Sequence, residues 1–166
     1  MNKIGQFKDG LFCTWSGPIS SEWVDYNGHL RDAFYMLIFS YASDGFMDLI
    51  GLDEAGRNQS QRTIYTLETH LNYLLEVKQG GQYAVMSQIL ATDSKRVRLF
   101  HNLINLETGV NHATNEQALL HIDQTGPKAA VFNPDVAQKL ADLATPQNDL
   151  AWPENAGRAI TFGQKK

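Results

Sequence analysis

Hydrophobic residues recur with two different periods along the chain. Between Leu30 and Ile50 they recur every three or four positions, which predicts one amphipathic helix of roughly 21 residues and about 31 Å. Gly51 follows directly, at the place where a glycine commonly ends a helix. The next segment, Gly51–Arg62, is polar and contains glycine, so we expect a loop there.

Alternation with a period of two predicts strands on both sides of this helix. The expected strands are Leu11–Ile19, Thr63–Val77, Gln82–Thr92, Lys95–Glu107 and Val110–Asp123. In the second of these, alternation places Tyr65, Leu67, Thr69, Leu71, Tyr73 and Leu75 on one face and Thr66, Glu68, His70 and Asn72 on the other. Gly80-Gly81 and Thr108-Gly109 predict hairpin turns. One early helix followed by strands and tight turns indicates an α+β domain whose antiparallel sheet wraps round the helix.

The pattern changes after Gln124–Pro127. Asn133 as an N-cap and Pro134 in the first turn, followed by spaced apolar residues, predict a short C-terminal helix. From Pro146 onward there is no strong periodicity. We therefore expect a single domain over residues 1–145 and an extended tail over residues 146–166.

Composition and charge narrow the class of protein. Of 166 residues, 43% are hydrophobic and 19% are charged, as in an ordinary folded domain. The net charge of −4 argues against a nucleic-acid partner held by bulk electrostatics, although it leaves room for a small basic patch that binds phosphates. There is neither an apolar signal segment nor a stretch of about 18 apolar residues, so we expect a cytoplasmic protein with no membrane partner.

Metal and thiol chemistry find no support in the sequence. The single cysteine, Cys13, excludes an internal disulfide and a multi-cysteine metal site, and its apolar neighbours indicate structural packing. The remaining candidates, His70, His101, His112 and His121, lack the spacing of metal ligands, so no metal site is expected.

The candidate chemistry lies in Trp23–Tyr35, which reads WVDYNGHLRDAFY. Asp25 precedes the predicted helix, whose N-terminus offers free backbone N–H groups and the positive end of a dipole. An anion or a polarised carbonyl could therefore bind beside this carboxylate. Local chemistry leaves a second interpretation equally open, namely that Asp25 or Asn27 caps the helix.

Asp25, Gly28, His29, Asp32 and Tyr35 fit the pattern D-x-x-G-H-x-x-N-x-x-Y. This pattern resembles hotdog-fold acyl-CoA thioesterases of the 4-hydroxybenzoyl-CoA thioesterase type, with Asp32 in place of the usual asparagine. The longer string YNGHLRDAFY is similar to the hotdog thioesterases associated with carnitine breakdown, which are proposed to act on betainyl-CoA. The resemblance runs from about Leu11 to Asp123 and implies a hotdog fold in the order β-α-β-β-β-β.

Under this resemblance Asp25 either attacks the thioester carbonyl or activates water, and the sequence does not choose between the two roles. The backbone N–H of Asp32 would stabilise the oxyanion, aided by the helix dipole. The Asp32 side chain adds a second carboxylate near Asp25, unless it points outward or pairs with a cation. The residues expected to line or shape the substrate site are Asn27, Gly28, His29 and Tyr35, with His29 and Tyr35 mainly as scaffold.

Further substrate contacts are expected from Tyr65 and Glu68 on the second strand. Lys95 and Arg96 follow Asp93-Ser94, and the resemblance implies that cations of this hairpin bind the phosphates of CoA. On spacing alone these residues also fit a solvated turn. CoA enters as part of the substrate, so no separate cofactor is expected. The resemblance further implies a homodimer or homotetramer with the active site between two subunits.

The acyl group is the least determined feature. A betainyl group carries a quaternary ammonium, which aromatic faces and carboxylates bind. Several aromatic residues are available, and core packing explains them equally well: Trp15, Trp23, Tyr26, Tyr41 and Tyr65. The alternatives are a thioesterase for an aromatic or medium-chain acyl-CoA, a hotdog dehydratase, and a non-catalytic acyl-CoA-binding protein.

Overall fold

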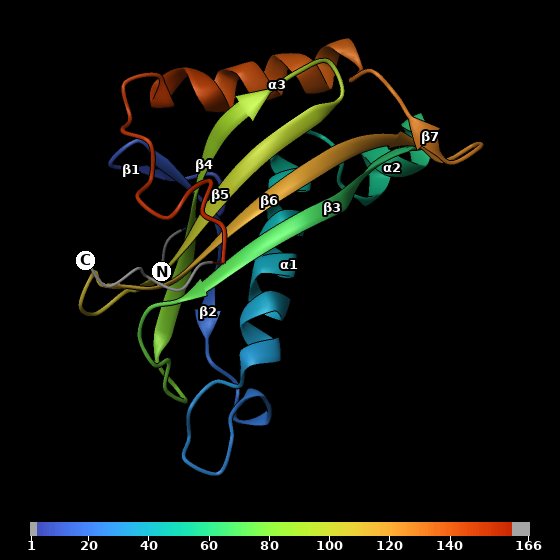
Figure 1. Ribbon diagram of the computed structural model, residues 1–166. Helices are drawn as coiled ribbons and strands as arrows, with labels where there is room; N and C mark the ends of the chain where they lie inside the picture. The colour runs from blue at the N-terminus through green and yellow to red at the C-terminus, as the bar shows by residue number, and fades with distance from the viewer. Residues whose placement is uncertain (1–2, 161–166) are drawn as a thin grey trace.

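Among residues 3–160, which the structure describes, a seven-stranded antiparallel sheet wraps around one long helix (Figure 1). The structure is a computed structural model. The strands are β1 (Phe7–Lys8), β2 (Leu11–Pro18), β3 (Arg62–Tyr73), β4 (Gln82–Thr92), β5 (Arg96–Asn105), β6 (Asn111–Asp123) and β7 (Lys128–Ala129). The helices are α1 (Asp32–Leu49), α2 (Glu54–Ser60) and α3 (Pro134–Ala144), with 3₁₀ turns η1 (Ser21–Trp23) and η2 (Thr145–Gln147). The strands lie in the order β1-β2-β4-β5-β6-β3, with β7 on β6. The predicted α+β class is confirmed.

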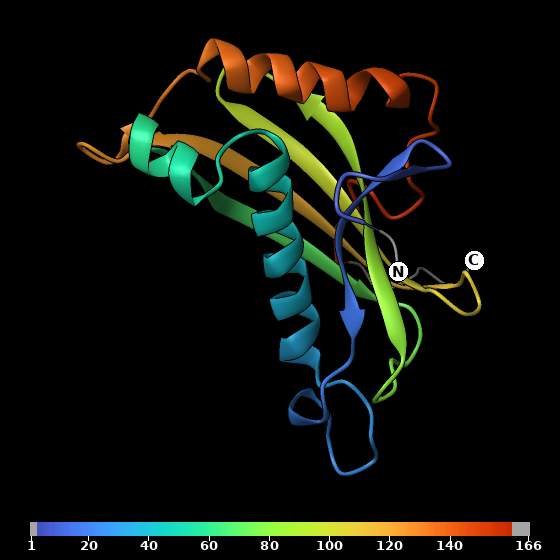
Figure 2. The same ribbon diagram turned by 180° about the vertical axis from the view of Figure 1, so that it is seen from behind.

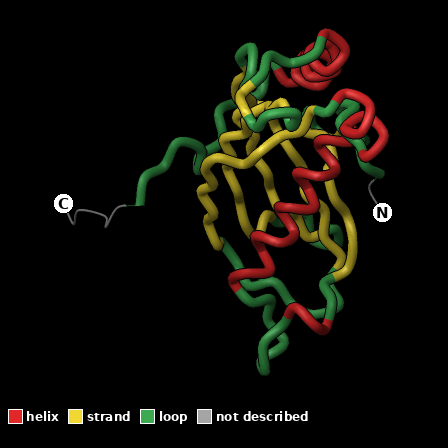
Figure 3. Tube along the Cα trace, turned by 90° about the vertical axis from the view of Figure 1, so that its right-hand side faces the viewer, coloured by secondary structure: helices red, strands yellow, loops and turns green. Residues whose placement is uncertain are grey.

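α1 runs across one face of the sheet, as Figure 3 shows, because one side of this helix is apolar. Ile38, Phe39 and Phe46 of α1 are fully buried in the core. At Gly45 the helix comes so close to β2 that an added Cβ would lie 2.0 Å from the carbonyl oxygen of Thr14. A larger residue would push α1 off the sheet, so this glycine sets the packing distance between the two.

α3 lies across one end of the sheet and closes the core there (Figure 2). Val136 and Leu140 of α3 belong to one buried cluster with Phe46 of α1. Pro134 occupies the first turn as predicted, whereas Asn133 makes no side-chain cap hydrogen bond. The short C-terminal helix is confirmed. No helix within residues 3–160 is long and apolar enough to cross a membrane.

Two predicted connections are wrong. The segment Gly51–Arg62, expected as a loop, contains α2, because the Asp53 carboxylate caps this helix by accepting the Gly56 N–H at 2.7 Å. Gly80-Gly81 does not form a hairpin, because β3 and β4 are not neighbours in the sheet. Instead this pair exchanges two backbone hydrogen bonds of 3.0 Å with Ile19, at the end of β2.

The predicted alternation in β3 is wrong across a β-bulge between Thr66 and Glu68. Ile64 and Thr66 face α1 before the bulge, and Thr69 faces α1 after it. The bulge therefore changes which residues share a face. As a result, Tyr65 and Glu68 both point away from α1, toward the outer face of the sheet.

The first residues of the predicted tail pack against the sheet. The Gln147 side chain is buried, where its amide oxygen accepts the Ile89 N–H at 2.8 Å and its amide nitrogen donates to the Ser87 carbonyl at 3.0 Å. The Trp152 ring lies over the Arg98 guanidinium at 5.0 Å. This segment is thus folded onto the domain rather than extended, and residues 161–166 lie outside the described part. The domain boundary at residue 145 stays a prediction.

Candidate active site

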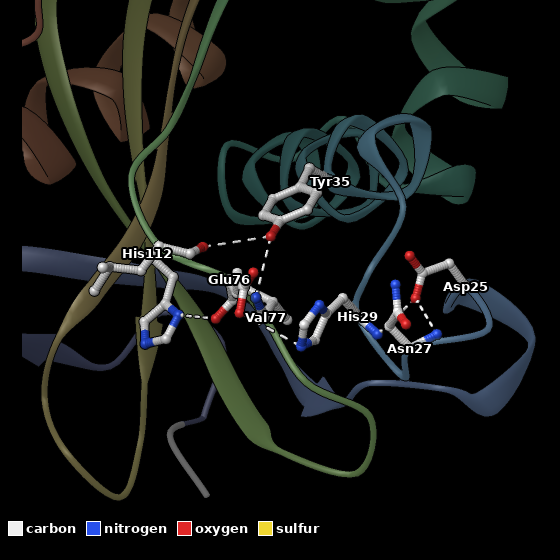
Figure 4. A network of polar contacts seen from close by, with 8 residues as sticks. Asp25, Asn27, His29, Tyr35, Glu76, Val77 and His112 are labelled. Carbon is white, nitrogen blue, oxygen red and sulfur yellow. Dashed lines mark hydrogen bonds and ion pairs between the residues drawn. The ribbon is translucent and has the colours of Figure 1, made fainter.

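Asp25 lies in the loop between η1 and α1, and this loop folds back on its carboxylate (Figure 4). The Asp25 Oδ1 atom accepts the backbone N–H of Asn27 at 2.8 Å and that of His29 at 3.1 Å. The Asp25 N–H in turn donates to the His29 carbonyl at 2.8 Å. Gly28 completes the loop with a φ of +75°, a conformation that suits glycine. These bonds fix the carboxylate in place.

The Asp25 carboxylate is ionised, and its two oxygens differ in the hydrogen bonds that they accept. The backbone N–H of His29 is the main cause that holds the pKa of Asp25 below its ordinary value of 3.8, and the N–H of Asn27 adds to it. Within residues 3–160 no hydrogen bond or ion pair reaches the other oxygen, Oδ2. Neither Asp25 nor Asn27 caps α1, because Arg31 is the N-cap residue. The interpretation as a cap of the helix is therefore wrong, although Asp25 does cap its own turn through the two bonds to Asn27 and His29.

The Asp25 loop is attached to the segment that joins β3 to β4. The Leu30 N–H donates to the Val77 carbonyl at 2.8 Å, and the Gln79 N–H donates to the Gly28 carbonyl at 3.0 Å. Because both bonds join backbone atoms, the loop and this connection form a short paired unit at one end of the sheet.

Tyr35 of α1 and His29 of the loop each contact the β3–β4 connection, to which Glu76 belongs (Figure 4). The Tyr35 hydroxyl accepts the Val77 N–H at 3.2 Å and donates to the Leu75 carbonyl at 3.4 Å. Burial raises the pKa of Tyr35, so the hydroxyl keeps its proton. The His29 Nε2 atom lies 3.4 Å from the Glu76 carboxylate. Both Tyr35 and His29 therefore hold the loop by contacts with the β3–β4 connection.

The first turn of α1 brings N–H groups and a second carboxylate to the same end. Asp32 is the first helical residue, where backbone N–H groups have no acceptor inside the helix. Its exposed side chain accepts the Ala33 N–H at 2.8 Å. Tyr73, the last residue of β3, donates its hydroxyl to the Asp32 carbonyl at 3.3 Å. The Asp32 side chain thus points outward, as one of the predicted alternatives has it.

Other predicted contacts lie far from Asp25 along the sheet. The Asp25 loop contacts the segment before β4, whereas Lys95 and Arg96 follow the end of β4 (Figure 1). β4 has 11 residues, which span about 35 Å. Tyr65 and Glu68 lie on the outer face of the sheet, and Glu68 lines a cavity of about 470 Å³ there. A single chain therefore does not gather these four residues around Asp25.

In the turn between β4 and β5, the side chain of one of the two predicted cations, Arg96, is bound by a carboxylate of the same turn. The Asp93 carboxylate accepts the backbone N–H groups of Lys95 and Arg96 at 2.8 and 2.7 Å. Its other oxygen accepts the Arg96 side-chain Nε–H at 2.7 Å. The Lys95 ammonium forms no ion pair with any residue that the structure describes. Lys95 is thus the freer cation.

Two residues of this region were missed by the sequence analysis. Glu76 lies in what we expected to be a strand, and no motif marks it as a site residue. Only the fold brings it to His29. Tyr73 carries a weak signal as an aromatic residue near the end of a strand, but its contact with Asp32 depends on the bulge in β3.

His101 and Cys13 lie in the protein core. His101 is fully buried, with Nδ1 at 2.7 Å from the Ser87 hydroxyl, and burial lowers the pKa of His101 to about 3. Cys13 is buried, as predicted. Among residues 3–160 there is no group of three or more His, Cys, Asp and Glu side chains that could hold a metal ion.

The fold and the loop ahead of α1 define the class of protein. A model of the thioesterase-like superfamily matches residues 19–140, which include the Asp25 loop, α1 and the four long strands from β3 to β6. The chain belongs to this thioesterase-like superfamily. The predicted hotdog fold and the predicted activity of a thioester hydrolase are thereby confirmed.

Individual relatives narrow this class. The chain is 46% identical to the betainyl-CoA thioesterase of Pseudomonas aeruginosa over 150 residues, which make up 90% of this chain and 94% of that protein. It is 36% identical, over 89% of its length, to the L-carnitine dehydrogenase/betainyl-CoA thioesterase of Rhizobium sp., of which it spans only 29%.

Two solved structures are also similar to this chain in sequence and in fold. A hypothetical protein from Staphylococcus aureus in complex with CoA is 31% identical, with a TM-score of 0.86 over 97% of this chain and 98% of that one. A candidate thioesterase from Pseudomonas putida KT2440 is 40% identical, with a TM-score of 0.80 over 92% and 97%.

Proposed function

We propose that the protein hydrolyses betainyl-CoA to betaine and CoA, with Asp25 as nucleophile or general base. The observation that carries this proposal is the Asp25 loop, in which two backbone N–H groups hold one oxygen of an ionised carboxylate. The similarity to a betainyl-CoA thioesterase over 90% of the chain supports the acyl group. The similarity to a structure in complex with CoA supports the thiol half of the substrate.

Both roles of Asp25 suit this geometry. As a nucleophile, the Asp25 oxygen bonds to the carbonyl carbon, the CoA thiolate leaves and takes up a proton, and water then cleaves the mixed anhydride. As a general base, Asp25 takes a proton from the water that attacks the carbonyl carbon. On either route, negative charge develops on the carbonyl oxygen. The N–H of Asp32 would stabilise this charge at the positive end of α1.

The complete site lies between two subunits in this proposal. β3 is an edge strand of 12 residues with exposed apolar side chains that include Tyr65 and Leu67, which suits pairing with a second copy. Antiparallel pairing of two β3 strands would bring Lys95 and Arg96 of one subunit to the same end of the dimer as Asp25 of the other. A CoA ester could then reach from the cations to the carboxylate. Light scattering tests this arrangement, and an active folded monomer would contradict it.

The decisive variant is Asp25→Asn, assayed by thiol release from betainyl-CoA and from other acyl-CoA esters. We expect kcat to fall about 1,000-fold with little change in KM, as for removal of a nucleophile or base. Undiminished hydrolysis would overturn the role of Asp25. If the wild type bound the esters tightly without hydrolysing any of them, the protein would be an acyl-CoA-binding protein instead. A higher kcat/KM for a neutral medium-chain or aromatic ester would overturn the acyl assignment.

A further inference from the structure

The Asp32 carboxylate is an unpaired negative charge next to the proposed oxyanion site. It accepts one hydrogen bond, from the Ala33 N–H, and takes part in none of the ion pairs within residues 3–160. The neighbouring Arg31 forms none of these ion pairs, and its Nε–H donates to the Val24 carbonyl at 3.2 Å. The side chain and the backbone N–H of Asp32 belong to one residue, so the carboxylate necessarily lies close to the N–H that would bind the carbonyl oxygen.

A negative charge at this place suits only one kind of acyl group. With a neutral acyl group, the Asp32 carboxylate repels the oxyanion as it forms and slows the reaction. A cation in the acyl group changes the sign of this effect, because it is attracted to the carboxylate. In a betainyl group the quaternary nitrogen is joined to the carbonyl carbon through one carbon atom, so the two lie about 2.5 Å apart. A carbonyl held at the Asp32 N–H therefore brings the cation to the Asp32 carboxylate.

Tyr73 provides an aromatic surface at the same position. Its hydroxyl donates to the Asp32 carbonyl at 3.3 Å, and its ring meets the Tyr35 ring edge to face, with centroids 5.1 Å apart. This contact fixes the Tyr73 ring, yet 54% of the residue is exposed. A quaternary ammonium cannot donate hydrogen bonds and binds to aromatic faces and carboxylates. Tyr73 offers an aromatic ring and Asp32 a carboxylate.

We infer that Asp32 and Tyr73 are specificity-determining residues, whose carboxylate and ring bind the quaternary ammonium of the acyl group. This inference rests on the proposed function, because it places the carbonyl oxygen at the Asp32 N–H. It assigns a role to the Asp32 side chain, for which the proposed function alone gives none. It also separates two parts of one residue: the backbone of Asp32 serves the reaction, and its side chain selects the substrate.

The test compares two esters of nearly equal shape and different charge. These are betainyl-CoA and 3,3-dimethylbutanoyl-CoA, in which carbon replaces the quaternary nitrogen. The variant Asp32→Asn keeps an oxygen that can accept the Ala33 N–H and removes only the charge. We expect the ratio of kcat/KM for the two esters to fall at least about tenfold, because kcat/KM for betainyl-CoA falls much more than kcat/KM for the neutral ester. Tyr73→Leu should lower the same ratio about threefold.

Asp48→Asn is the matched control, because it removes an exposed carboxylate from the other end of α1. This control should leave the ratio unchanged. An equal loss on both esters in Asp32→Asn would show a purely structural role and overturn the inference, as would an unchanged ratio. If the wild type hydrolysed neither ester, the proposed function itself would be wrong, and the inference would fail with it. Circular dichroism of each variant confirms that the fold is retained.

Discussion

Asp25 and Asp93 lie in turns of similar geometry at opposite ends of β4. In each turn, one carboxylate oxygen accepts two backbone N–H groups from residues just downstream. In each, one of these backbone bonds is the main cause of a lowered pKa, so both Asp25 and Asp93 are ionised. The turns differ at the second oxygen. The Arg96 guanidinium occupies that of Asp93, whereas no described residue reaches that of Asp25.

Under the proposed function, this difference separates a structural carboxylate, Asp93, from a reactive one, Asp25. The charge of Asp93 is compensated inside its own turn, so this carboxylate stabilises the β4–β5 connection and holds Arg96. Asp25 has the same backbone support but keeps one oxygen for a ligand. Backbone hydrogen bonds thus position and ionise a carboxylate, and the occupancy of its second oxygen decides what it can do.

The largest expected effect is the loss of activity in Asp25→Asn, and the same substitution at Asp93 serves as the comparison. Asp25→Asn should lower kcat for betainyl-CoA about 1,000-fold, because it removes the reactive oxygen. Asp93→Asn should change kcat by less than about threefold, because an exposed ion pair contributes only about 0–1 kcal/mol. Initial rates of thiol release measure both. Similar losses in the two variants would mean that the second oxygen does not distinguish the turns.

The next effect is the acid limb of the pH profile. In the proposed mechanism the reaction needs the Asp25 carboxylate, and the backbone bonds keep the pKa of Asp25 below 3.8, so more than half of this group is still ionised at pH 3.8. We therefore expect the midpoint of the acid limb of kcat/KM that Asp25 causes to lie below pH 3.8, with a fall of about tenfold per pH unit below the lowered pKa. Initial rates in each acidic buffer, taken within a brief exposure, measure this limb. Circular dichroism in the same buffers shows whether the enzyme is still folded. A steep fall in folded enzyme well above pH 3.8 would point to another titrating group.

A smaller effect is expected at the cations of the Asp93 turn. Lys95→Ala should raise KM for betainyl-CoA about fivefold, by loss of one charge-assisted phosphate contact. Arg96→Ala should raise it less, about twofold, because Asp93 already engages this guanidinium. The N-acetylcysteamine thioester of betaine lacks the phosphates, so neither variant should change its hydrolysis. Lys128→Ala, at an exposed lysine of β7, is the control. Equal effects on both thioesters would remove these cations from the CoA site.

The sequence predicts the fold well where one period persists and poorly where a side chain interrupts it. The run from Leu30 to Ile50 keeps a helical period, and α1 ends within two residues of the predicted limits. Thr63–Val77 keeps a period of two in the sequence, but a bulge reverses the faces after Thr66. Such a bulge leaves no mark in the alternation itself. α2 was missed because its main signal is a single cap, Asp53, in a short polar segment.

The prediction of the site from the sequence has the same limit, because it finds only residues that are close together along the chain. The residues of the Asp25 loop are close in sequence, so their motif alone predicts their grouping. Glu76 and Tyr73 join them only because β3 lies at the edge of the sheet and the chain must cross to β4. The motif selects Asp25, but the tendency to form a turn does not distinguish Asp25 from Asp93, because both residues begin turns held by backbone N–H groups. The contact between Arg96 and Asp93 separates them, and it depends on the conformation of one side chain.

The smallest effect should come from Glu76→Gln, which weakens the support of the Asp25 loop without touching Asp25. The His29–Glu76 pair is a surface contact, with side chains 32% and 69% exposed, and is charged only when His29 is protonated. Exposed pairs contribute about 0–1 kcal/mol, so kcat should fall by no more than about fivefold. The comparison of kcat with that of Glu107→Gln, at an exposed glutamate between β5 and β6, measures this loss. A loss as large as that of Asp25→Asn would mean that Glu76 itself takes part in the reaction, and the free oxygen of Asp25 would no longer explain the difference between the two turns.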